Sequence, residues 1–168
     1  MPSVTFEVPW ARGKQRPRFN RRRALEMMRH PEKGNQRLSY TPHRTMDDQA
    51  AIADAYRAAC ERTYGEVLSV PEKPSRGVVP SSCKARVRIE TWRKLPKSAL
   101  KAARLHGEPD VFGGRDKSDL DNTVKLVLDG LNGVAWRDDC CVTEIVAVRH
   151  DRTVRDHDLT RVTVSWDE

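Results

Sequence analysis

The stretch 120–131 constrains the fold more than any other part of this sequence. Its apolar residues recur at helical spacing, namely Leu120, Val124, Val127, Leu128 and Leu131. This spacing predicts a helix that buries one side against a core and stops near Gly133. Aspartates stand on both sides of it, Asp119 and Asp121 at its start and Asp138 and Asp139 beyond its end. The stretch therefore combines a core element with a concentration of carboxylates.

Alternating apolar and polar residues predict four strands around this helix, at 4–8, 84–92 and near 141–149 and 159–166. A polar hairpin loop is expected between the last two. A longer helix should run from Thr45, which can cap it, to Gly65, and a shorter one within 96–107 should open at Ser98. The pattern favours an α+β fold, a single domain over residues 1–168 with a mixed sheet of about four strands and flanking helices.

The positive charge of the chain is concentrated in residues 12–44. This segment holds eleven basic and two acidic residues, a charge of +9, whereas the whole chain carries +7. Its prolines and glycine predict a loop or arm. A localised basic segment favours a polyanionic partner, because neutralising phosphates releases counterions. The alternative is a solvated arm without a ligand.

Several classes of protein and site are disfavoured. The four cysteines lack CxxC spacing and the five histidines form no ligand motif, so a zinc site is not expected. We expect no small-molecule cofactor either. No apolar run approaches the roughly 20 residues of a membrane span, and the first residues lack a signal-peptide core. A cytoplasmic protein with reduced thiols and no membrane partner is the expectation.

The aspartates allow two interpretations. Each could be an ordinary stabiliser, with Ser118 or Asp119 as the cap, an Asp121–Lys125–Asp129 ladder along the helix, and turn acids after it. Alternatively, residues 134–139 are long enough to fold back and bring Asp139 to Asp119 and Asp121. That oxygen-only set would suit Mg²⁺ or Mn²⁺ in phosphodiester hydrolysis, with Lys125 adding positive charge at the scissile phosphate.

The second interpretation is favoured by a resemblance. DLDNTVK (119–125) followed by WRDD (136–139) resembles the signature of RusA-type Holliday junction resolvases, which are commonly encoded by phages or prophages. The resemblance implies a RusA-like fold, a homodimer, and Mg²⁺-dependent paired nicking of four-way DNA junctions in recombination and repair. It also implies that Asp119, Asp121 and Asp139 bind the metal, with Asp138 as a possible further ligand, and that Lys125 is catalytic.

Other residues are expected to contact DNA. The candidates are Arg16, Arg18, Arg21, Arg22, Arg23, Arg115 and Lys117. Tyr40 and Phe112 could either contact bases or pack into the fold. Two rival functions stay open at this point: a metal-dependent nuclease for flaps, other branched DNA or RNA, and a nucleic-acid-binding protein without catalysis.

Overall fold

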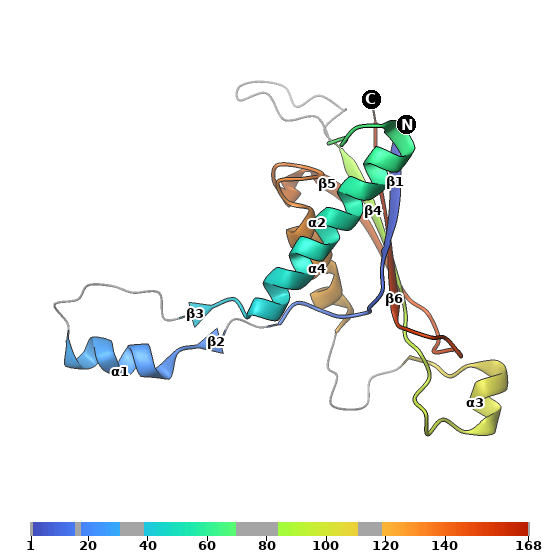
Figure 1. The fold of residues 1–168 in the computed structure, drawn as a ribbon, viewed down its shortest axis with the longest axis horizontal. Helices are drawn as coiled ribbons and strands as arrows, with labels where there is room; N and C mark the ends of the chain where they lie inside the picture. The colour runs from blue at the N-terminus through green and yellow to red at the C-terminus, as the bar shows by residue number, and fades with distance from the viewer. Residues whose placement is uncertain (1, 16–17, 31–38, 70–83, 111–118, 168) are drawn as a thin grey trace.

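A computed structural model describes residues 2–15, 18–30, 39–69, 84–110 and 119–167 (Figure 1). Its centre is a sheet of β1 (Ser3–Val8), β6 (Leu159–Trp166), β4 (Ala85–Trp92) and β5 (Val142–Arg149), in that spatial order. β6 pairs antiparallel with β1 and β4, whereas β4 and β5 run parallel. The expected α+β class with a mixed four-stranded sheet is confirmed.

The connection between the last two strands differs from the prediction. β5 and β6 are not neighbours, because β4 lies between them and pairs with both. Residues after β5 therefore cross to the far side of β4 and make contacts on the way, where Arg152 bridges to Glu108 and Thr153 to Lys94. The predicted hairpin was wrong because local alternation gives the position of a strand and not its partner.

Two helices cover one face of the sheet. α2 (His43–Tyr64) and α4 (Leu120–Leu131) pack against each other and against the strands, as Figure 1 shows. Their inward residues meet those of the strands in a continuous apolar core that includes Phe6, Ile52, Tyr56, Val87, Ile89, Leu126, Val127, Trp136, Val162 and Val164. Burial of this core supplies the main free energy of folding.

The starts of the two helices α2 and α3 differ from the predicted starts at Thr45 and Ser98. α2 begins after Pro42, and Thr45 is buried within its first turn, where its hydroxyl accepts a hydrogen bond from the Gln15 amide at 3.3 Å. Gly65 ends α2 with φ +79°, as predicted. The short helix α3 (Lys101–His106) follows Leu100, so Ser98 does not open it.

The buried face of α4 is rotated from the one predicted. Val127 and Leu131 are buried as expected, but so are Thr123, Leu126 and Gly130, whereas Leu120, Val124 and Leu128 are half-buried. The cause is close contact with α2. A Cβ atom added to Gly130 would lie 2.9 Å from Cβ of Ile52, so this side of α4 must face α2.

The basic segment contains a helix where a loop was predicted. α1 (Arg21–Arg29) lies between β2 (Arg18–Phe19) and β3 (Ser39–Tyr40), which pair as a two-stranded ribbon. Figure 1 shows these elements extending away from the sheet as an arm. Asn20 caps α1 by accepting a hydrogen bond from the Arg23 amide at 3.1 Å. Arginine is a good helix former, and the prolines that suggested a loop stand outside the helix.

Candidate active site

The first acidic residue of the motif is the N-cap residue of α4, but its side chain does not cap the helix. Asp119 is the N-cap residue, and its backbone carbonyl accepts hydrogen bonds from the amides of Asn122 and Thr123 at 3.1 and 3.2 Å. Its carboxylate makes no capping bond and the residue is exposed. The interpretation of Asp119 as a side-chain helix cap is therefore wrong, and the carboxylate oxygens are available to a ligand.

The second acid pairs with the lysine of the motif. Lys125 Nζ lies 3.1 Å from Asp121 Oδ2, and both side chains are 62% exposed. The hydrogen bond from Lys125, with the charge of its ammonium, holds the pKa of Asp121 below its ordinary value. Because exposed pairs are strongly screened by solvent, this contact adds little to stability. Asp121 and Lys125 thus present an ionised carboxylate and an ammonium together at the surface.

Asp129 has different partners from those predicted. Its Oδ2 lies 2.5 Å from Lys14 Nζ and 3.3 Å from Gln49 Nε2, so the ladder from Lys125 to Asp129 is not formed. Lys14 reaches it from the N-terminal segment and Gln49 from α2. Asp129 therefore ties α4 to two other parts of the chain.

The last two acids of the motif stand beside each other. Asp139 begins a short 3₁₀ turn, Asp139–Cys141, that leads into β5. Its pKa is raised, first by a hydrogen bond shared with Asp138, then by partial burial and by the negative charges of Asp138 and Asp129. Asp139 therefore lies close to Asp138 and within electrostatic reach of Asp129, near the C-terminal part of α4. A cation bound here would relieve the repulsion between these carboxylates.

The chain between α4 and Asp139 does not fold back along the helix, contrary to the prediction. The Gly133 amide donates to the Trp136 carbonyl at 2.6 Å, and the indole N–H of Trp136 donates to Asn132 Oδ1 at 2.7 Å. Trp136 is also 1% exposed. Its burial winds residues 132–136 into a turn, which keeps Asp139 beyond the helix end instead of returning it to the start.

The two acidic positions are consequently separated within one chain. α4 has twelve residues, which corresponds to about 18 Å. In the part of the chain that the structure describes, no three His, Cys, Asp or Glu side chains are grouped closely enough to hold a metal ion. Metal binding by Asp119, Asp121 and Asp139, with Asp138 as a further ligand, stays a prediction, as does the catalytic role of Lys125.

A segment that the sequence did not point to lies against the start of α4. The Lys14 amide donates to the Asn122 carbonyl at 2.8 Å, and a Cβ atom on Gly13 would lie 2.8 Å from Cβ of Asn122. Arg12 anchors the same segment to α2 through Asp48 at 3.0 Å. Only a glycine allows this approach, but a single Gly13 in a basic stretch gave no signal of it.

The structure describes only some of the residues that were predicted to contact DNA. Arg21, Arg22 and Arg23 are exposed in the first turn of α1, and Arg18 lies in β2 opposite Tyr40. Tyr40 is 45% exposed, so it is not part of the core. Arg16, Arg115, Lys117 and Phe112 lie outside the described residues.

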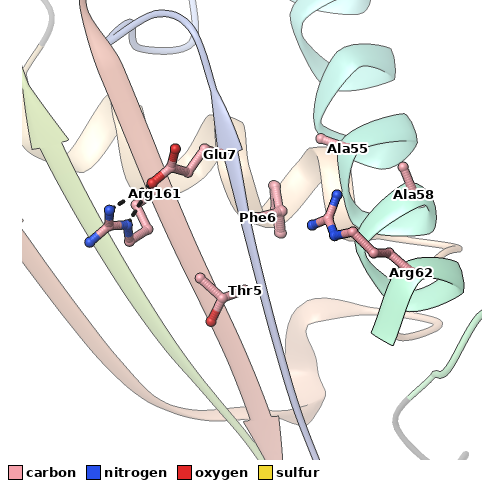
Figure 2. A pocket seen from close by; sticks show the side chains of 7 residues that line it. All are labelled: Thr5, Phe6, Glu7, Ala55, Ala58, Arg62 and Arg161. Carbon is pink, nitrogen blue, oxygen red and sulfur yellow. Dashed lines mark hydrogen bonds and ion pairs between the residues drawn. The ribbon is translucent and has the colours of Figure 1, made fainter. Parts of the chain in front are cut away.

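A groove of about 670 Å³ lies elsewhere, between β1 and α2 (Figure 2). It is lined by Thr5, Phe6, Glu7, Ala55, Ala58, Arg62 and Arg161. Among the described residues that line it, the one carboxylate is that of Glu7, which is bound by Arg161 at 2.7 Å. The groove therefore lacks the carboxylate set expected for a nuclease, and the acidic motif around α4 remains the candidate active site.

Comparison with protein families shows the family of this chain. The model of the family described as endodeoxyribonuclease RusA matches residues 9–165, nearly the whole chain. The chain belongs to the RusA endodeoxyribonuclease family. A RusA-family protein is an endonuclease that acts on branched DNA. The match includes β4, β5, β6 up to residue 165, both covering helices and the acidic motif, whereas β1 lies before it. The comparison with curated proteins gives no match. Among the described residues, no helix has the length and apolar character to span a membrane.

Proposed function

We propose that this chain is a Mg²⁺-dependent endonuclease that resolves four-way DNA junctions as a homodimer, by paired symmetric nicks. Membership of the RusA family supplies the endonuclease class. The observation that carries the proposal further is the exposed group of Asp119, Asp121 and Lys125 at the start of α4. None of the three is needed to cap the helix or fill the core, so their presence is best explained by a ligand.

The donor set suits a hard divalent cation. Asp119, Asp121 and Asp139 offer only carboxylate oxygens, which Mg²⁺ prefers and Mn²⁺ accepts. The Asp119 carboxylate makes no capping hydrogen bond, and the Asp139 carboxylate is repelled by that of Asp138. A bound cation would therefore stabilise both carboxylates. When bound, the ion would supply charge neutralisation at the phosphate and a water of lowered pKa. Asp138 would either bind directly or hold Asp139 in place.

Lys125 and the arm would act on the DNA itself. The ammonium of Lys125 is held by Asp121 and can donate to a phosphate oxygen at the cleaved bond. Arg21, Arg22 and Arg23 would bind backbone phosphates further away, which gives affinity that falls steeply with salt. Cleavage by an activated water would leave 5′-phosphate and 3′-hydroxyl ends.

The substrate specificity can be tested directly. Initial nicking rates would be measured in Mg²⁺ on a mobile four-way junction, a flap, a linear duplex and a structured RNA of the same length. The proposal expects the junction to be cut fastest, with opposed strands nicked at symmetric positions. Equal rates on linear duplex would contradict junction resolution and leave a less selective nuclease. Faster cutting of the flap or RNA would assign the site to that substrate.

A further inference from the structure

The first strand, β1, stands at one end of the sheet and has a partner on one side only. Among the described residues β6 alone pairs with it, in antiparallel register. The Trp166 amide donates to the Pro2 carbonyl at 3.3 Å, so these two residues form a hydrogen-bonded pair of the ladder. Such pairs alternate along an antiparallel ladder. Every second residue counted from Pro2 therefore faces β6, and the residues between them turn their amides and carbonyls outward, namely Ser3, Thr5 and Glu7.

One of these outward residues is already bonded, which confirms the direction. The Ser3 amide donates to the Tyr64 hydroxyl at 3.1 Å, and this hydroxyl donates to the Ser3 carbonyl at 2.9 Å. Tyr64 is the last residue of α2, so the helix closes the edge of β1 at its start. Within the described part of the chain, no group is bonded to the backbone of Thr5 or Glu7 on this side. These two residues offer two amides and two carbonyls at the open edge.

The groove between β1 and α2 runs along this same edge. Thr5 and Glu7 line it from the strand, and Ala55 and Ala58 line it from the helix, as Figure 2 shows. The two alanines are three residues apart and so share one side of α2. Their small side chains leave a space of about 670 Å³, beside the buried ring of Phe6. An extended chain placed next to β1 would have room for its side chains below the helix.

The groove also holds a positive charge that no neighbour neutralises. Arg62 lies one turn beyond Ala58, and Figure 2 shows its guanidinium turned from α2 toward β1. An arginine in the last turn of a helix suits the helix dipole. Among the described residues, however, Arg62 forms no ion pair, and the carboxylate of Glu7 is held by Arg161 at 2.7 Å. A carboxylate brought by a ligand would find Arg62 available.

We propose that this groove binds an extended segment of another protein, which joins β1 as a fifth strand. The segment would exchange backbone hydrogen bonds with Thr5 and Glu7. Small apolar side chains at alternate positions would lie against Ala55 and Ala58, and a carboxylate would pair with Arg62. The groove shares no residue with the acidic motif, so this interaction is independent of nuclease activity.

Two other occupants fit the groove less well. The helix-side residues of β1, Val4, Phe6 and Val8, are buried in the core, so β1 of a second copy would bring no side chain into the groove. Its Glu7 would also be held by its own Arg161. A DNA strand has no backbone donors for the two outward carbonyls. A polypeptide in extended conformation supplies both donors and acceptors at the spacing of β1.

Amide hydrogen exchange followed by NMR on the full chain tests the open edge directly. The probes are two capped octapeptides in which threonine alternates with aspartate, alanine and valine. The aspartate stands near the N-terminus in one and near the C-terminus in the other, because the added strand can run in either direction. Without peptide, the amides of Thr5 and Glu7 should exchange fast and those of Val4 and Phe6 slowly. One peptide should slow the first two at least about tenfold.

Three results would overturn the proposal. The first is that neither peptide slows the amides of Thr5 and Glu7. The second is that a single-stranded DNA oligonucleotide slows them and the peptides do not, which would assign the edge to DNA. The third is that they slow as the concentration of the protein alone is raised, which would assign the edge to a second copy.

A proline at the edge provides a variant with a matched control. Thr5→Pro removes an outward amide and no bond to β6, and proline is tolerated on edge strands in this orientation. Thr5→Ala keeps the amide but, like the proline, loses the hydroxyl contact with Thr163 at 3.0 Å. In fluorescence anisotropy with the labelled peptide, Thr5→Pro should abolish binding and Thr5→Ala should retain it. Equal binding by the two variants would contradict strand addition.

The charge is tested at a separate position, which decides the matter even if Thr5→Pro fails to fold. Arg62→Glu should weaken peptide binding about fivefold or more, and an asparagine in place of the peptide's aspartate should remove most of this difference. Arg57→Glu is the control, an exposed arginine of α2 that pairs with Asp54 at 2.9 Å and does not line the groove. An equal loss in both variants would show a general charge effect and refute the role of Arg62.

Discussion

Replacing Gly130 with alanine tests the packing that orients the acidic helix. The added Cβ would lie 2.9 Å from Cβ and 3.0 Å from Cγ2 of Ile52, and 3.1 Å from the Gln49 carbonyl oxygen. All three atoms belong to α2, and the carbonyl is part of its rigid backbone. α4 and α2 must therefore move apart by several tenths of an ångström, and a shift of α4 is transmitted to the acids at both of its ends.

The magnitude follows from two opposed effects. Alanine in place of glycine within a helix stabilises by about 1 kcal/mol, whereas an overpacked core contact costs about 1–3 kcal/mol. The contact with backbone places the cost near the upper end, so we expect a net loss of about 1–2 kcal/mol. For a chain of this size, the Tm should fall by about 2–8 °C.

Thermal unfolding followed by circular dichroism at 222 nm would measure this change. The exposed Ala58 on α2 offers a calibration, because Ala58→Gly alters helix propensity without a packing contact to α4. If Gly130→Ala leaves the Tm unchanged or raises it, helix propensity outweighs the clash and the close approach of α2 and α4 is refuted.

Further predictions concern the charged groups. Asp110 is 2% exposed in its side chain and lies within 4 Å of three arginines, so Asp110→Ala should destabilise by about 3 kcal/mol in urea unfolding; a loss below 1 kcal/mol would contradict its role as their counterion. Asp138→Asn should lower the raised pKa of Asp139 in an NMR titration, and should remove the loss of stability that accompanies ionisation of Asp139 as the pH rises through that pKa; an unchanged pKa would refute the shared proton. Lys125→Ala removes the hydrogen bond and the positive charge that lower the pKa of Asp121, so this pKa should rise toward 3.8 in the same titration. The small stability that the pair contributes is present above pH 3.8 and is lost as the pH falls through the depressed pKa.

The strands were predictable because their alternation is local and strong. The last strand was placed at 159–166, and β6 has those bounds. Partners were not predictable, since β4 pairs both with β5, in parallel, and with β6, antiparallel, and all three strands show the same kind of local alternation. The order of strands in a sheet cannot be predicted from the residue pattern of one strand.

The acidic motif was identified from the sequence, but its assembly was not. Residue types and spacing give the carboxylates at both ends of α4. The turn that keeps the ends apart depends on Trp136, whose burial and bond to Asn132 arise from tertiary packing. The partners of Asp129 could not be predicted for the same reason, because Lys14 and Gln49 come from segments distant in the sequence. Helix spacing alone favoured Lys125 instead.

The most direct test of the central claim is a nicking assay on a mobile four-way junction across a Mg²⁺ titration, with the wild-type chain, Asp121→Asn and Asp54→Asn. Asp54 is the matched control, an exposed helical aspartate paired with Arg57 at 2.9 Å. The account predicts Mg²⁺-dependent cleavage that falls at least about a hundredfold in Asp121→Asn, as for loss of a metal ligand, and is unchanged in Asp54→Asn. Cleavage that survives Asp121→Asn, or that proceeds at full rate in excess EDTA, would contradict it.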